Sequence, residues 1–168
     1  MDDAIHLSLL VILVTAAIND VRFQKIPNIL SLSTIGVGFA YHLWQSGLQG
    51  LLFSLGGTLL GMAFLILFYL GGKMGAGDVK LMGAVGSILG PSGVFKAFLF
   101  TAVVGGIYAI ILLLCRGRLI ETLERISLSL KQSFLTTKPT FITDDGKTAP
   151  VLYYALAIWI GTSLSMVF

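Results

Sequence analysis

Two aspartates stand apart from the other acidic residues of this chain. Six of the eight acidic residues lie in the N-terminal tail or in one polar segment, where they are solvated charges. Asp20 instead ends one apolar stretch, and Asp78 begins another. An ionisable group at membrane depth is costly and needs a pairing or functional explanation. We therefore predict that Asp20 and Asp78 are catalytic residues.

Two carboxylates held together in a low-dielectric setting have a defined chemistry. They cannot easily both ionise, so one retains a proton while the other is charged. The charged carboxylate takes a proton from water as the water attacks a peptide carbonyl. The protonated carboxylate hydrogen-bonds the carbonyl oxygen and later protonates the leaving amine. This is aspartyl peptidase chemistry, and it requires no metal, cofactor or nucleophilic side chain.

Two glycines precede the second aspartate in the segment Gly75-Ala76-Gly77-Asp78. A peptide substrate must approach as an extended strand, and backbone without a side chain lets it come close. Gly75 and Gly77 are therefore candidate substrate-binding residues. Asp78 also has a structural alternative, because a carboxylate at a helix start meets the positive end of the helix dipole and can cap it. Capping and catalysis are compatible.

The composition of the chain indicates that these residues lie in a membrane. Of the 168 residues, 56% are hydrophobic and 11% are charged, and the mean hydropathy is +0.94. A soluble domain of this size cannot bury so much apolar surface. The apolar stretches have helical lengths and lack a period of two, so we predict an all-α integral membrane bundle rather than a barrel.

We predict about six transmembrane helices in a single membrane domain over residues 1–168. Glycine, proline and polar residues divide the apolar sequence into spans. These spans cover residues 5–18, 27–44, 51–70, 79–89, 94–115 and 150–168. The polar segment of about residues 116–149 is predicted to be a cytoplasmic loop. Its stretch from Leu119 to Leu135 is amphipathic and is expected to lie on the membrane surface.

The cationic residues predict the orientation of the bundle. With the N-terminus outside, ten of the eleven lysines and arginines fall on the cytoplasmic side, and only Lys96 falls opposite. This asymmetry follows the positive-inside rule and explains the net charge of +3 without a nucleic-acid partner. The same topology places Asp20 and Asp78 at the cytoplasmic face.

The segments around the two aspartates resemble those of a known family. Gly-Ala-Gly-Asp-Val-Lys-Leu at 75–81, with Asn-Asp-Val-Arg and Ile-Pro-Asn within 19–28, closely resembles the paired motifs of the prepilin peptidases, and residues 149–161 look like their last helix. The resemblance covers most of the chain. It implies a membrane aspartyl endopeptidase with Asp20 and Asp78 as its catalytic pair.

The same resemblance implies the substrates and the cellular location. The expected partners are prepilin-like precursors, cut at the cytoplasmic face of the inner membrane just after a short basic leader. The chain is most similar to the short, cleavage-only enzymes of tight-adherence (Flp-type) pili and to archaeal preflagellin peptidases. Larger members carry an N-terminal methyltransferase region with paired cysteines. This sequence begins at its first span, so we expect no methyltransferase region.

Other functions remain as alternatives. A small transporter or proton channel could use the same two acids, since intramembrane carboxylates often mark ion pathways. A rhomboid-like serine peptidase could use Ser92 within Gly90-Pro91-Ser92-Gly93 together with His42, although rhomboids place their histidine on a later helix. Presenilin-like proteases share Gly-x-Gly-Asp, but the Ile-Pro-Asn segment argues against them. A zinc peptidase is set aside because the sequence has no His-Glu-x-x-His.

Three polar residues near the motifs are predicted to have local roles. Asn28 and Gln24 stand close to the start of the second span, where a polar residue is usually a helix cap. Lys80 follows Asp78 and is expected to extend its charge to the membrane surface.

Overall fold

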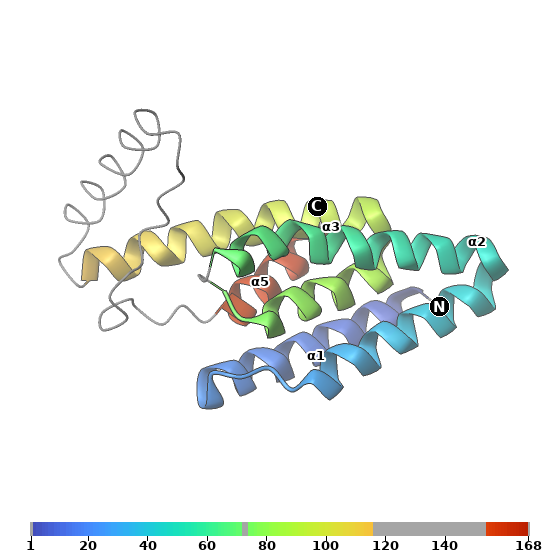
Figure 1. Ribbon diagram of the computed structural model, residues 1–168, viewed down its shortest axis with the longest axis horizontal. Helices are drawn as coiled ribbons and strands as arrows, with labels where there is room; N and C mark the ends of the chain where they lie inside the picture. The colour runs from blue at the N-terminus through green and yellow to red at the C-terminus, as the bar shows by residue number, and fades with distance from the viewer. Residues whose placement is uncertain (1, 72–73, 116–153, 168) are drawn as a thin grey trace. The chain divides into compact units, whose positions relative to one another are not determined.

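The described part of the chain is entirely α-helical. The computed structural model describes residues 2–71, 74–115 and 154–167, which form α1 (Asp2–Phe23), α2 (Asn28–Leu70), α3 (Ala76–Cys115) and α5 (Tyr154–Val167) (Figure 1). The predicted all-α class is confirmed. The predicted loop at 116–149, its amphipathic stretch and the start of the last span at Pro150 lie outside the described residues.

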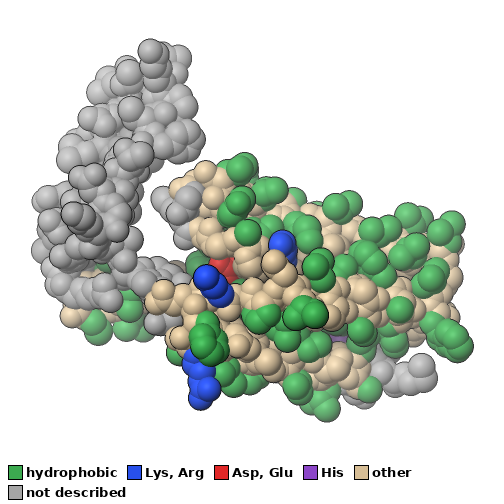
Figure 2. Space-filling model, turned by 60° about the horizontal axis from the view of Figure 1, so that its bottom comes forward, with side chains coloured by type: hydrophobic (Ala, Val, Ile, Leu, Met, Phe, Trp, Pro, Cys, Tyr) green, Lys and Arg blue, Asp and Glu red, His purple; other side chains and the backbone are tan. Residues whose placement is uncertain are grey.

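Three helices of the described chain, α1, α2 and α3, are long and apolar enough to cross a membrane. Large hydrophobic side chains are exposed along all three, and Figure 2 shows such side chains spread over the face in view. In water this exposure would be unfavourable, but in a bilayer it places apolar side chains against lipid. α5 is also apolar but shorter.

The chain divides into two compact units. One consists of Met1–Gly105 with Tyr153–Phe168, and the other of Gly106–Leu152. In the second unit the described residues are the last turns of α3. Both candidate aspartates belong to the first unit.

α2 and α3 are each interrupted near the middle. Gly47 in α2 has φ +59° and Gly90 in α3 has φ +69°, a left-handed backbone that favours glycine. Pro91 follows Gly90 and lacks the N–H that would continue the helix. These breaks fall within residues 45–49 and 90–93, where the sequence predicted turns, whereas the count of six spans stays a prediction.

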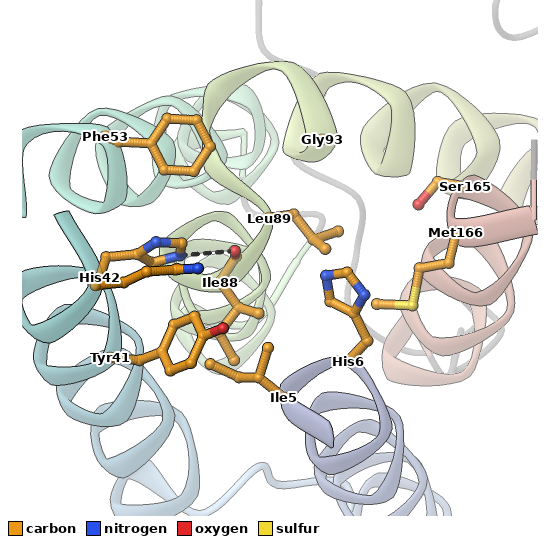
Figure 3. A pocket seen from close by; sticks show the side chains of 11 residues that line it. Ile5, His6, Tyr41, His42, Phe53, Ile88, Leu89, Gly93, Ser165 and Met166 are labelled. Atoms are coloured by element: carbon orange, nitrogen blue, oxygen red, sulfur yellow. Dashed lines mark hydrogen bonds between the residues drawn. The ribbon is translucent and has the colours of Figure 1, made fainter. Parts of the chain in front are cut away.

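Side chains of α2 satisfy the carbonyls that the break in α3 frees. The Ser54 hydroxyl donates to the Ser87 carbonyl, whose helical partner would have been the missing N–H of Pro91. His42 Nε2 bonds the next carbonyl, that of Ile88, at 3.0 Å (Figure 3). A carbonyl only accepts, so this bond makes Nε2 the protonated nitrogen. The break in α3 is therefore part of its contact with α2.

Glycines bring α2 and α3 close together. A methyl group on Gly57 would overlap the carbonyl oxygen of Gly86, and one on Gly61 would lie 2.5 Å from the carbonyl oxygen of Met82. Such small residues permit close packing of membrane helices. This contact fixes the first half of α3, which carries Asp78, against α2.

α1 and α5 complete the core of the first unit. The buried side chains of α1 recur at helical spacing at Ile5, Leu9, Leu13 and Ala16. α1 packs on α5 and on α2. α5 also contacts α3, because a methyl group on Gly161 would meet the backbone of Thr101.

Candidate active site

Asp78 is held by the start of its own helix. Its Oδ2 accepts a hydrogen bond from the Gly75 N–H at 3.2 Å, and its own N–H donates to the Gly75 carbonyl at 3.2 Å. The carboxylate of a first-turn residue here reaches back to the helix cap, as in a capping box. The predicted capping role of Asp78 is thereby confirmed.

The second oxygen of Asp78 has no such anchor. The residue is only 8% exposed, and its Oδ1 is buried without a hydrogen-bond partner among the described residues. Buried polar atoms are nearly always paired, so an unpaired carboxylate oxygen needs an explanation such as a catalytic role. One oxygen of Asp78 therefore holds the carboxylate in place, while the other makes no hydrogen bond to the described residues.

Asp20 lies within electrostatic range of Asp78, although a long stretch of sequence separates them. α1 runs past its predicted end at Ile18 to Phe23, so Asp20 occupies the last turn of a helix rather than a hinge. The helical hydrogen bonding continues past Asp20, since the Gln24 N–H donates to the Asp20 carbonyl at 2.8 Å. The carboxylates of Asp20 and Asp78 are close enough for their charges to repel each other. The structure thus brings the two predicted catalytic residues together.

The start of α5 contributes to the same place. The backbone N–H of Ala155 forms a hydrogen bond with the half-buried Asp20 carboxylate. Tyr154 lies within electrostatic range of Asp78, and its hydroxyl oxygen would be 3.4 Å from a methyl group on Gly105. The sequence pattern does not predict a role for Tyr154 at the site. The only signal was its position early in the last apolar segment.

The segment Ile26-Pro27-Asn28 packs on the glycine-rich segment that carries Asp78. A methyl group on Gly77 would lie 3.0 Å from Cβ of Ile26, closer than an ordinary contact. Lys80 Nζ donates a hydrogen bond to Asn28 Oδ1 at 2.9 Å. The two sequence motifs are therefore joined by packing and by a hydrogen bond, and together they position Asp78.

The predicted roles of Asn28 and Gln24 as caps of the second span require correction. Asn28 does not cap α2, because the cap position is Pro27, which makes no side-chain hydrogen bond, and the Asn28 amide oxygen is engaged by Lys80. Lys80 therefore has a specific partner rather than only a surface position. Gln24 has φ +52° and ends α1 in the left-handed conformation, which is uncommon for a residue other than glycine.

The arrangement suits acid–base chemistry by carboxylates. Within residues 2–71, 74–115 and 154–167, no three His, Cys, Asp or Glu side chains cluster to hold a metal. The residues that the structure does bring together are two acids, a tyrosine and the backbone of the glycine-rich segment. Such a group can activate water and stabilise a carbonyl oxygen.

Comparison with known protein families gives a match over more than half of the chain. The model of the type IV leader peptidase family matches residues 7–110, a range that contains Asp20, Asp78 and both candidate glycines. No curated protein and no solved structure matches the chain.

Proposed function

We propose that this chain, which belongs to the type IV leader peptidase family, is an aspartyl endopeptidase. Its substrates in this proposal are prepilin-like precursors. It removes the short basic leader of type IV, Flp-type precursors at the cytoplasmic face of the inner membrane. The observation that carries the proposal is the placement of Asp20 within electrostatic range of Asp78, whose second oxygen is buried and has no hydrogen-bond partner among the described residues.

The reaction in this proposal uses a water molecule held between the two carboxylates. Because the two carboxylates are within electrostatic range and like charges repel, one carboxylate keeps a proton while the other is ionised. The ionised group takes a proton from the attacking water, and the protonated group donates to the scissile carbonyl and then to the leaving amine. The Gly75 N–H keeps one oxygen of Asp78 in place throughout.

Charge and hydropathy support the proposed location. Ten of the eleven cationic residues fall on one side when the N-terminus is placed outside, which makes that side cytoplasmic. Asp20 near the end of α1 and Asp78 at the start of α3 then both face the cytoplasm. A precursor anchored by its apolar helix presents its leader junction at this same depth.

The test is cleavage of a precursor that carries a short basic leader before an apolar helix. Membranes containing wild type, Asp20→Asn, Asp78→Asn or Ser92→Ala are compared by gel shift. We expect cleavage by wild type and Ser92→Ala and its loss in both asparagine variants. Full cleavage by both asparagine variants would exclude the aspartyl mechanism. Proton flux that depends on both acids, without any cleavage, would support a channel instead.

A further inference from the structure

A groove between α1 and α5 adjoins the candidate active site. It has a volume of about 220 Å³ and is lined by Val14, Ala17, Ile18 and Val21 of α1 and by Leu156 and Trp159 of α5. Its lining is apolar apart from Arg22. Ile18 and Val21 are 51% and 45% exposed, so the groove is open along its side.

The groove and the aspartate pair are built on the same turns. Ala17 and Val21 flank Asp20 on α1. Leu156 follows Ala155, whose backbone N–H forms a hydrogen bond with the Asp20 carboxylate. A segment lying in the groove therefore passes close to Asp20.

We propose that this groove binds the apolar segment of the precursor that follows the cleaved bond, an inference that rests on the proposed function. The charge of the lining selects the occupant. Arg22 repels a basic leader, so the leader must lie on the other side of the aspartates. The apolar segment can bury its side chains against the groove because the exposed side chains at its opening, Ile18 and Val21, are themselves apolar.

Disulfide cross-linking tests which part of the precursor lies in the groove. The enzyme carries Asp78→Asn to prevent cleavage, Cys115→Ser to remove its only cysteine, and Ile18→Cys in the groove. The matched control carries Leu59→Cys, on an exposed position of α2 that is 65% accessible. Single cysteines are placed in the precursor's leader or in its apolar segment. We expect Ile18→Cys to form cross-links with the apolar segment but not with the leader. The control Leu59→Cys is expected to form no cross-links with either.

Kinetics provide a second, independent readout. Ile18→Trp fills the groove, and loss of one aliphatic contact of the precursor raises KM roughly tenfold while kcat is little changed. Leu59→Trp is expected to leave both constants unchanged. A KM change shared by both variants would indicate a general effect on the membrane protein and would contradict the proposal.

The outcomes separate this inference from the proposed function. Cleavage by wild type but not by the asparagine variants would support the proposed function. If, in that case, Ile18→Cys cross-links no more than the control and Ile18→Trp has the wild-type KM, the groove does not bind the precursor and the inference is wrong. Cross-linking to the leader would also overturn it. Absence of cleavage by wild type would refute the proposed function and this inference with it.

Discussion

The two glycines of the motif are predicted to respond differently to a methyl group. In Gly77→Ala the new Cβ lies 3.0 Å from Cβ of Ile26, so Ile26 or the motif must shift. In Gly75→Ala the new Cβ lies 3.4 Å from Oδ2 of Asp78, which is an ordinary contact. We therefore predict that glycine is required at 77 for packing of the free enzyme, and at 75 only for the approach of a substrate.

The magnitudes follow from these contacts. Overpacking at Gly77 costs about 1–3 kcal/mol, offset by up to about 1 kcal/mol of better helix propensity, so the free energy of unfolding falls by roughly 0–3 kcal/mol. Ile26→Gly removes the opposing Cβ, and the coupling between the two substitutions is about 0.5–3 kcal/mol. Gly75→Ala changes stability by less than about 0.5 kcal/mol. Displacing the substrate strand by about 1 Å lowers its cleavage roughly a hundredfold.

Thermal unfolding in detergent and precursor cleavage, measured on the same preparations, provide the assay. Gly75→Ala should keep the wild-type Tm and lose cleavage. Gly77→Ala should lower both, and its effect on Tm should shrink when Ile26→Gly is also present. The reasoning is refuted if Gly75→Ala cleaves at the wild-type rate, or if the Gly77→Ala effect is the same with and without Ile26→Gly.

Three further substitutions separate catalysis from stability. Asp78→Asn keeps an acceptor for its helix cap and removes the repulsion from Asp20, so cleavage falls roughly a hundredfold or more while Tm is unchanged or higher in a melting assay. Gly57→Ala forces a methyl group into the Gly86 carbonyl, so unfolding measurements should show a loss of about 1–3 kcal/mol; an unchanged Tm would contradict the close helix contact. Tyr154→Phe removes a hydroxyl near Asp78 but keeps the ring. In cleavage kinetics kcat should fall roughly tenfold, the loss expected for one hydrogen bond to a charged group, while Tm stays constant.

The helices and their breaks were predictable because their causes are local. Long apolar runs require helices in a bilayer, where every backbone group must be paired within its segment. Glycine and proline interrupt such runs, so the breaks at Gly47 and Gly90 fell where turns were predicted. The functional importance of Asp20 and Asp78 was predicted for a similar reason, since an acid beside an apolar run needs an explanation.

The contacts that position the aspartates could not be derived from local patterns. Lys80 and Asn28 are 52 residues apart in sequence, and nothing in either segment indicates their hydrogen bond. The packing of Gly77 on Ile26 and the approach of Tyr154 to Asp78 likewise depend on how whole helices meet. For this reason Asn28 was expected to cap a helix, and no role at the site was predicted for Tyr154.

The Gly90-Pro91-Ser92-Gly93 segment illustrates how a catalytic-looking motif can be explained by packing. As a serine peptidase element it would need a histidine able to take a proton from Ser92. The nearby candidate, His42, instead uses Nε2 as a donor to the Ile88 carbonyl, and Ser54 satisfies the Ser87 carbonyl that Pro91 leaves free. Gly90 and Pro91 create both unpaired carbonyls, and α2 supplies a side chain for each. The hydrogen bonds of His42 and Ser54 therefore assign this segment to the junction of α2 and α3, as the plain-turn interpretation of Gly-Pro-Ser-Gly predicts.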